Sequence, residues 1–169
     1  MQAAAAEEER ARLGRRLHGL RVADVMTPHP VTAHPDAVVT QFINNVVLGP
    51  RFSTYPLADA DGRLVGMVTL NRIRALPPQQ RATRRLIDIA CPPDEVPVAH
   101  PDEPLVDLVA RMGGCADGRA VVVDSAGRIA GVVSPTDIST AMTIADLRSP
   151  PPYPLLGADL NAGAGRRTS

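Results

Sequence analysis

The chain has very few aromatic side chains and no lysine. Its 169 residues include two Phe, two Tyr and no Trp. Because 44% of the residues are hydrophobic, the core must be packed mainly by Val, Leu, Ile and Ala. Every basic side chain is Arg, and the 18 basic residues balance 18 acidic ones. With a net charge of zero, no overall basic field favours nucleic acid as a partner.

Cysteine and long apolar runs are also scarce. The two cysteines, Cys91 and Cys115, lie much further apart than a CxxC spacing. The sequence therefore predicts neither a disulfide framework nor a cysteine zinc site. No segment resembles a signal peptide, and no apolar run approaches the length that crosses a bilayer. We expect a soluble, cytoplasmic chain without a transmembrane segment.

The second half of the chain repeats the first. Gly131 to Asp137 (GVVSPTD) matches Gly66 to Arg72 (GMVTLNR), which lies 65 positions earlier. The tetrapeptide Ala-His-Pro-Asp occurs at residues 33–36 and again at residues 99–102. A repeat of this length indicates two tandem structural units.

The segment from Ser134 to Asp137 lies where an apolar strand passes into a helix, and two interpretations of it compete. In the first, Ser134 caps the helix and Pro135 takes the first helical position, where a missing N–H costs nothing. In the second, the hydroxyl and backbone N–H groups of the turn bind an anion, while the Asp137 carboxylate accepts the hydroxyls of a ribose. The segment taken alone is compatible with either interpretation.

Each unit resembles a cystathionine β-synthase (CBS) domain, and two in tandem resemble a Bateman module. The resemblance rests on the Asp-Val-Met-Thr-Pro opening at 24–28, the Asp-x-x-Gly-Arg turns at 59–63 and 124–128, and the Gly-h-h-Thr/Ser segments. It implies an α/β (α+β) fold in which two βαββα units pack about a pseudo-twofold axis and leave two clefts between them.

The resemblance also divides the chain into five parts. They are an N-terminal helical extension at 1–21, the first CBS domain at 22–76 (the first unit), a linker at 77–85, the second CBS domain at 86–147 (the second unit) and a disordered C-terminal tail at 148–169. In the extension, Leu13, Leu17 and Leu20 predict a narrow apolar face. The extension is either a solvated helix or one that faces a partner.

Local patterns predict several elements inside the units. In the first unit we expect a helix capped by Asp36 and ending near Gly49-Pro50, followed by strands at 55–58 and 64–69. In the second unit, Leu105, Leu108, Val109 and Met112 have helical spacing, and the apolar run at 120–123 predicts a strand buried on both faces.

The resemblance implies an adenine nucleotide such as AMP or ATP as the ligand of the second unit, with no cofactor, no metal and no catalytic residue. The implied site has Ser134 and Asp137 on the ribose with Thr136 beside them, Arg119 on phosphate, and backbone near Val98 and Ala120 against the base. The corresponding site of the first unit comprises Thr32, Thr69 and Arg72. We expect it to be degenerate, because the guanidinium of Arg72 has only donors, unless Arg72 contacts a phosphate.

A second resemblance concerns the setting of the module. Residues 21–28, Cys91-Pro92 and 95–97 are similar to the CBS-pair tail of bacterial site-2-type zinc metalloproteases. Those enzymes carry His-Glu-x-x-His inside membrane helices, and this chain has no such motif. The sequence thus predicts no enzyme, and it predicts a location at the cytoplasmic face of the membrane if the chain is part of a protease.

Two functions follow from these patterns. In the first, the module senses an adenine nucleotide and tunes an effector in the same polypeptide or complex. In the second, it is a dimerisation or protein-interaction module that binds no nucleotide, and Asp137 serves only the helix cap. A homodimer is expected under both hypotheses, and Asp137 is the residue that distinguishes them.

Overall fold

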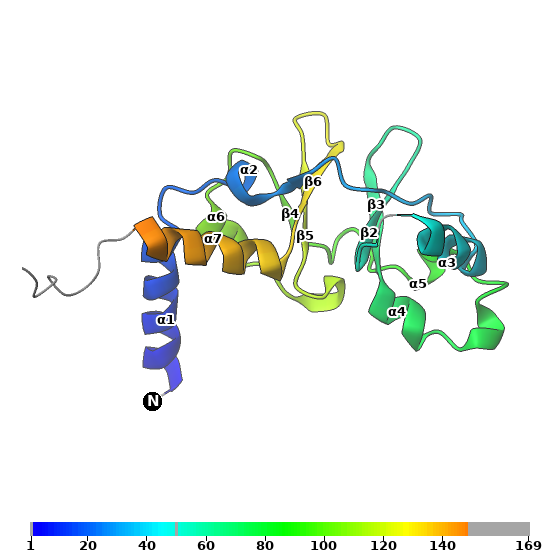
Figure 1. Ribbon diagram of the computed structural model, residues 1–169, viewed down its shortest axis with the longest axis horizontal. Coiled ribbons are helices and arrows are strands. Elements are labelled where there is room, and N and C mark those ends of the chain that lie inside the picture. The colour runs from blue at the N-terminus through cyan, green and yellow to red at the C-terminus, as the bar shows by residue number, and fades with distance from the viewer. Residues whose placement is uncertain (1, 50, 149–169) are drawn as a thin grey trace, which may run out of the picture.

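Two β-sheets stand side by side at the centre of the molecule. The computed structural model describes residues 2–49 and 51–148 (Figure 1). One sheet has the order β1-β6-β5-β4, and the other pairs β2 with β3. The strand bounds are Thr27–Pro28 (β1), Thr54–Ala58 (β2), Leu64–Thr69 (β3), Val98–Ala99 (β4), Ala120–Val123 (β5) and Ile129–Val133 (β6).

The two sheets repeat one arrangement. In the second unit β5 and β6 are antiparallel, β4 runs parallel to β5, and β1 runs antiparallel to β6. In the first unit β2 and β3 are antiparallel, and isolated bridges extend both edges: Ala33 runs parallel to Leu57, and Cys91 runs antiparallel to Met67. The internal repeat of the sequence is therefore a repeat of structure.

The opening segment of each unit crosses to the other unit. Residues 22–28, which open the first unit, pair with β6 and place Val22 in the core of the second unit. Residues 86–91, which open the second unit, pair with β3 and place Leu86 in the core of the first. We call 22–28 and 86–91 the exchanged segments, because each completes the unit to which it does not belong in sequence.

The repeated glycine lies where an exchanged segment passes. A Cβ on Gly131 would lie 2.7 Å from the Met26 sulfur and 3.1 Å from the carbonyl oxygen of Thr27. A Cβ on Gly66 would lie 3.1 Å from the Ala90 Cβ and 3.2 Å from the carbonyl oxygen of Cys91. The Gly-h-h-Thr/Ser pattern therefore begins with glycine because a neighbouring backbone approaches too closely for a side chain.

A pseudo-twofold axis relates the two units. Arg63 and Arg128, which are repeat-equivalent, form an antiparallel bridge, and the backbone N–H of Ile129 donates to the carbonyl of Gly62 at 3.0 Å. Contact between equivalent residues of two repeats is what a twofold relation requires. The predicted fold of two repeated units about such an axis is confirmed.

Helices cover the outer faces and ends of the sheets (Figure 1). Their bounds are Gln2–Arg16 (α1), Val22–Val25 (α2), Val39–Leu48 (α3), Leu70–Ala75 (α4), Leu86–Ile89 (α5), Leu105–Val109 (α6) and Pro135–Arg148 (α7), with single 3-10 turns at Pro78–Gln80 (η1) and Gly114–Ala116 (η2). None of the helices in residues 2–49 and 51–148 combines the length and the apolar character needed to cross a bilayer.

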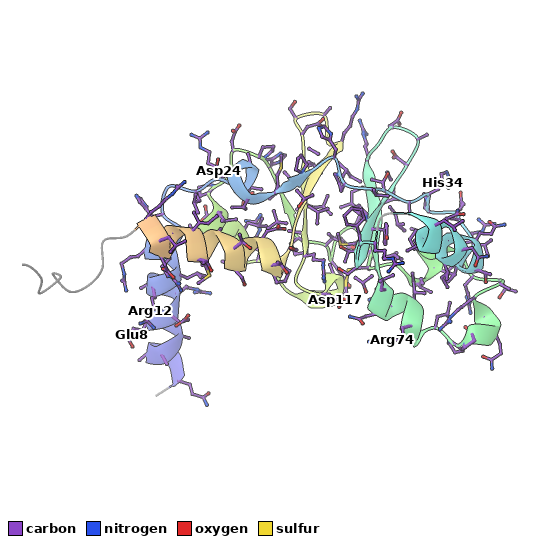
Figure 2. The ribbon with its side chains drawn as sticks, viewed as in Figure 1. Glu8, Arg12, Asp24, His34, Arg74 and Asp117 are labelled. Atoms are coloured by element: carbon purple, nitrogen blue, oxygen red, sulfur yellow. A yellow bond between two sulfur atoms is a disulfide. The ribbon has the colours of Figure 1, made fainter. Side chains whose placement is uncertain are left out.

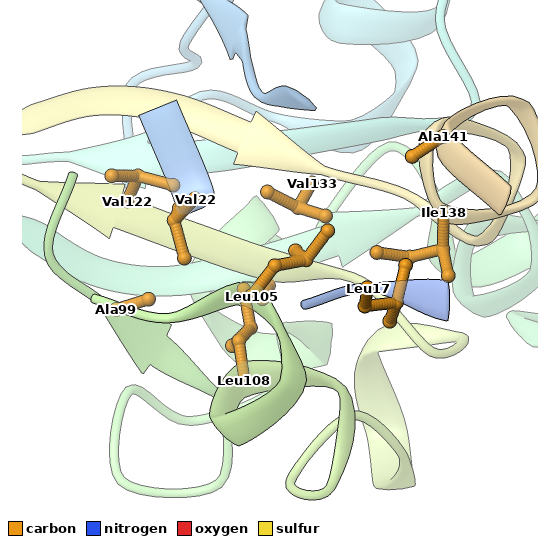
Figure 3. Packing of buried hydrophobic residues seen from close by; sticks show 10 residues of the cluster. Leu17, Val22, Ala99, Leu105, Leu108, Val122, Val133, Ile138 and Ala141 are labelled. Atoms are coloured by element: carbon orange, nitrogen blue, oxygen red, sulfur yellow. The ribbon is translucent and has the colours of Figure 1, made fainter. Parts of the chain in front are cut away.

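Each unit has its own hydrophobic core, and a smaller cluster joins them. In the second unit Leu17 and Val22 pack with Leu105, Val122 and Ile138 (Figure 3). The core of the first unit contains the edge-to-face ring pair of Phe42 and Tyr55, with centroids 4.9 Å apart. Between the sheets lie the residues of the third cluster, which are Met67, Cys91, Val96, Ala116, Val121 and Val123.

Several predicted elements agree with the structure, and some do not. Strands at 55–58, 64–69 and 120–123 are confirmed by β2, β3 and β5. The prediction that Asp36 caps a helix is wrong: α3 begins after Val38, and Asp36 instead accepts a hydrogen bond from Arg85 at 3.0 Å. The helix through Leu105 ends already at Val109.

The ends of the chain also modify the predictions. The N-terminal helix ends at Arg16, and Leu13, Leu17 and Leu20 contact the core of the second unit. The preceding residues of α1 project from the end of the molecule (Figure 1). The predicted disordered tail lies outside the described residues except for Arg148, which ends α7.

The two cysteines are joined, which corrects the expectation from their spacing. Cys91 and Cys115 form a disulfide whose Cα atoms are 5.7 Å apart. Cys91 belongs to an exchanged segment, and Cys115 lies in η2. The sequence separation was misleading because the exchange carries Cys91 across the sheet to β3, where η2 also makes contact.

Candidate functional site

A pocket of about 310 Å³ lies between the two units, and we call it the central pocket. Its volume is at the lower end of the range for small-molecule sites. The beginning of α7, the exchanged segment around β1 and the residues before β2 all contribute to its wall. The lining residues are Thr27, Pro28, His29, Pro30, Val31, Phe52, Ser53, Thr54, Arg119, Val132, Ser134, Thr136 and Asp137.

Ser134 and Asp137 form a reciprocal cap at the start of α7. The backbone N–H of Asp137 donates to Ser134 Oγ at 3.2 Å, while the N–H and Oγ–H of Ser134 both donate to Asp137 Oδ2 at 2.7 Å. Among the described residues, only Oδ2 of this carboxylate receives hydrogen bonds. The other oxygen, Oδ1, is therefore available to accept from a bound molecule, so the capping and binding interpretations are compatible.

Arg119 brings a positive charge to the same pocket. Its guanidinium donates to the carbonyl of Asp117 at 3.1 Å and to Ser53 Oγ at 2.8 Å. Asp117, labelled in Figure 2, lies at the junction of the units. Within the described chain no carboxylate lies within ion-pair distance of Arg119. The side chain is thus held by neutral partners and retains charge for an anion.

Most of the pocket wall was missed by sequence reasoning, which predicted four of its 13 residues. Thr27 and Pro28 belong to an exchanged segment that His29 to Val31 continue, and Phe52, Ser53 and Thr54 reach the pocket from the start of β2. Phe52 is 42% exposed, and its ring stands edge-on to Tyr55 with centroids 6.2 Å apart. The sequence shows Phe52 only as one of four aromatic residues, and no pattern in it placed this ring at the site.

Two predicted residues lie outside the central pocket. The backbone carbonyl of Val98, in β4, accepts a hydrogen bond from Arg111 at 2.9 Å. Ala120 is fully buried in β5, where it pairs with Val133 of β6. Neither residue lines the pocket. Of the predicted set, the structure brings together Arg119, Ser134, Thr136 and Asp137.

At the corresponding position of the first unit, the Arg72 side chain binds the backbone of the exchanged segment 86–91. Thr69 is fully buried and its Oγ1 accepts from the backbone N–H of Arg72 at 3.2 Å, so the cap is repeated. Arg72 takes the place of Asp137 and donates to the carbonyls of Ile89 and Ala90 at 2.6 and 3.5 Å. Its guanidinium is thus occupied by hydrogen bonds to the exchanged segment 86–91.

The third residue predicted for that first site is placed elsewhere. Thr32 lines a pocket of about 320 Å³ beside α3 that shares Val31 with the central pocket. Thr69 and Arg72 do not line it. The structure therefore does not bring Thr32 together with the other two.

A larger pocket, of about 670 Å³, lies between α1, α2 and α7. Arg16 and Asp146 form an ion pair in its wall. The hydrogen bond from Arg16 lowers the pKa of the Asp146 carboxyl. Because these charges neutralise each other and none of the predicted site residues lines this pocket, we place the candidate site in the central pocket.

Comparison with known proteins agrees with this architecture. The family model described as CBS domain matches residues 22–77 and again 88–144. Rip3 of Mycobacterium tuberculosis, a zinc metalloprotease by name, is 39% identical over 88% of this chain and 38% of its own length. The zinc metalloprotease MJ0392 of Methanocaldococcus jannaschii is 29% identical over 76% of this chain and 34% of its own. The chain thus spans little more than a third of these relatives.

Solved structures show the same fold. The CBS domain pair of protein MJ0100, solved with 5′-methylthioadenosine and S-adenosyl-L-methionine, has a TM-score of 0.61 at 25% identity and covers 73% of this chain and 96% of its own. CBSX2 from Arabidopsis thaliana has a TM-score of 0.67 at 19% identity, with 78% of this chain and 99% of its own covered. CBSX2 has also been solved with AMP, at 22% identity and a TM-score of 0.63 over 76% of this chain and 99% of its own.

Proposed function

The chain belongs to the CBS domain family as a tandem pair, which is a regulatory module, and on this premise we propose that its central pocket senses an adenosine-containing ligand such as AMP or ATP. The carrying observation is that one pocket unites the Asp137 carboxylate, the Arg119 guanidinium and the Phe52 ring. These are three chemically different groups, and a nucleotide has a counterpart for each.

Each part of a nucleotide matches one part of the pocket. A ribose offers two hydroxyls as donors, and Asp137 Oδ1 is an acceptor with no partner in the described chain. A phosphate suits the guanidinium of Arg119 and the start of α7. The adenine ring can stack on Phe52, a contact that contributes about 1–3 kcal/mol for bases on aromatic side chains.

The MJ0100 pair supports this ligand class. Its two ligands share an adenosine group and differ in what is attached to the ribose. A pocket that binds the shared adenosine group would admit AMP, ATP or a sulfonium compound. The choice among them would depend on the charge that the group attached to the ribose brings near Arg119. We therefore propose a class of ligand, compounds that contain an adenosine group, and not one particular nucleotide.

Ligand binding would act on an effector through the relative pose of the two units. The central pocket is lined from both units, so a ligand that prefers one pose shifts the equilibrium toward it by its difference in affinity. Similarity to Rip3 and MJ0392 makes a membrane metalloprotease the favoured effector. We propose that this chain is a module of such a protease or a partner of one, without catalytic chemistry of its own.

The experiment is a thermal-shift series on the purified chain with adenosine, AMP, ATP, 5′-methylthioadenosine and S-adenosylmethionine. At 100 times its Kd a ligand of the native state adds about 2.7 kcal/mol, which raises Tm by about 5–10 °C in a chain of this size. GMP serves as the base control.

Two variants test the roles of the pocket residues. Asp137→Asn keeps the acceptor for Ser134 but removes the carboxylate, and we expect the shift to disappear for every adenosine compound. Arg119→Met should remove the shift for AMP and ATP while retaining it for adenosine. Asp102→Asn, at a side chain 92% exposed, is the matched control. If no compound shifts Tm, or if Asp137→Asn responds like the wild type, the proposal fails.

The second candidate is a homodimer or protein-interaction module that binds no nucleotide. It is favoured by the reciprocal cap, which alone accounts for Ser134 and Asp137, and by the exposed apolar side chains of α7. Ile144 and Leu147 on that helix are 45% and 81% exposed. Light scattering of the wild type and of Leu147→Glu would show whether α7 mediates self-association.

A further inference from the structure

Three side chains of metal-binding type converge beside β3, outside the central pocket. Cys91, Glu95 and Cys115 place their sulfur and carboxylate atoms within 4.8 Å of one another. In the part of the chain that the structure describes, this is the only group of three such residues at that distance. None of the three lines the central pocket.

The backbone fixes all three positions. Cys91 exchanges two hydrogen bonds with Met67, at 2.8 and 3.0 Å, across the edge of the first sheet. Glu95 follows four residues later on a turn whose N–H donates to the carbonyl of Pro92 at 3.0 Å. Cys115 sits on the single turn η2, which contacts β3. The ligands are thus held by local turns and by a sheet edge.

The distances suit a tetrahedral ion after a small movement of one sulfur. Zn–S and Zn–O bonds of about 2.3 and 2.1 Å place two sulfurs ~3.8 Å apart and sulfur and oxygen ~3.5 Å apart. Cys115 Sγ lies 3.4 Å from Glu95 Oε2. Only the two sulfurs, which are bonded to each other in the disulfide, would need to separate.

We propose that, in its dithiol form, the protein binds a zinc-type divalent cation through Cys91, Cys115 and Glu95. Thiolates select zinc over magnesium or calcium. Cys115 is half-buried and Glu95 is exposed, so solvent reaches the fourth coordination position. Three protein ligands with an open position are an arrangement that zinc accepts.

The disulfide and the metal site are alternative states of the same two sulfurs. A dithiol reductant transfers two electrons and two protons to the S–S bond, which gives two thiols, while the reductant becomes a disulfide. The cation then displaces both thiol protons, because only thiolates coordinate. In the reverse direction a small-molecule disulfide accepts two electrons from the bound thiolates and two protons from water and becomes two thiols, while Cys91 and Cys115 form their disulfide and release the cation.

The test is a titration of the reduced full chain with Co²⁺, under anaerobic conditions and after removal of the reductant. Tetrahedral Co²⁺ with thiolate ligands gives a sulfur-to-metal charge-transfer band, and Zn²⁺ should displace it. We expect one equivalent to bind in the reduced protein and none in the disulfide form.

Variants identify the ligands. Cys115→Ser should abolish the band. Glu95→Gln should weaken binding by at least the roughly 10- to 100-fold that loss of an outer-sphere partner costs. The neighbouring Asp94→Asn, also at an exposed carboxylate, should bind like the wild type. Cys91 is left unchanged because it is fully buried. Circular dichroism of each variant checks that it is folded.

Two outcomes would overturn the site. One is a reduced wild-type protein that binds neither Co²⁺ nor Zn²⁺. The other is binding that persists unchanged in Cys115→Ser, which would place the cation elsewhere. Both outcomes leave the nucleotide proposal untouched, because the central pocket shares no residue with this cluster.

Discussion

The two units repeat one arrangement of strands and helices and differ at the last position of the repeated motif. At the start of α7, Asp137 lines the central pocket, whereas at the start of α4 its counterpart Arg72 binds the carbonyls of Ile89 and Ala90. The cap itself is present in both units, through Ser134 and Thr69. The repeated motif thus caps a helix in both units, and only in the second unit does its last residue line the central pocket.

The largest expected effect on the free energy of unfolding is at the two glycines where the exchanged segments cross. We predict that Gly66→Ala lowers the free energy of unfolding by about 1–3 kcal/mol, because its Cβ would meet the Ala90 Cβ and the Cys91 carbonyl. Gly131→Ala should cost less, since Met26 can adopt another rotamer. Urea denaturation of both variants tests this. A larger loss at Gly131 would show that the two crossings are not equivalent.

Arg72 provides the next comparison. Arg72→Met removes a half-buried cationic donor from two backbone carbonyls, and we predict a loss of about 1–3 kcal/mol. Asp137→Asn should cost less than about 1 kcal/mol, because an amide oxygen still accepts from Ser134. Arg74→Met, at an exposed side chain, is the control. Equal losses for Arg72 and Asp137 would contradict a structural role specific to the first unit.

The ion pair of Glu103 and Arg111, which has no counterpart in the first unit, should make the stability of the second unit depend on pH. The hydrogen bond from Arg111 lowers the pKa of Glu103 below its ordinary value of 4.5. The first unit has Ala37 and Asn45 at the equivalent positions. Because the folded pKa is depressed, the stabilisation is complete above about pH 4.5 and is lost as the pH falls through the lower, folded value.

The measurement for this pair is the unfolding free energy of the wild type and Glu103→Gln as a function of pH. We expect the variant to be less stable at neutral pH by about 0.2–1 kcal/mol, since the pair is partly solvent-exposed. The gap should close below pH 4. A gap that stays constant with pH would mean that packing, not charge, is lost in the variant.

The smallest effect on stability is expected in the last turns of α7, which is longer than its counterpart α4. Asp146, near the end of α7, pairs with Arg16 of α1 at the surface. Water screens this pair, so Asp146→Asn should leave the denaturation midpoint unchanged within error. A clear loss would show that α1 supports the second unit through this contact rather than through Leu17.

Sequence patterns predicted the strands better than they predicted which segments pack together. The repeat and the apolar runs identified β2, β3 and β5, because strand burial depends on local side chains. The exchange was not predictable in this way: Val22 and Leu86 begin equivalent segments, and an apolar side chain fits the core of either unit equally well. The part of the central pocket wall formed by Thr27 to Val31 and the contact between Cys91 and Cys115 both depend on the exchange, so neither was foreseen.

The exchanged segments also constrain how the chain folds as it is synthesised. Domains commonly fold as units, the N-terminal one first, while the ribosome is still translating the rest. Here the first unit lacks Leu86 and the strand partner of Met67 until residues 86–91 have emerged. Residues 22–28, made near the start, have no partner strand until β6 ends at Val133. Neither half can complete its fold alone: the first unit can close once residues 86–91 have emerged, whereas residues 22–28 find their partner strand only when the second β-hairpin has left the exit tunnel.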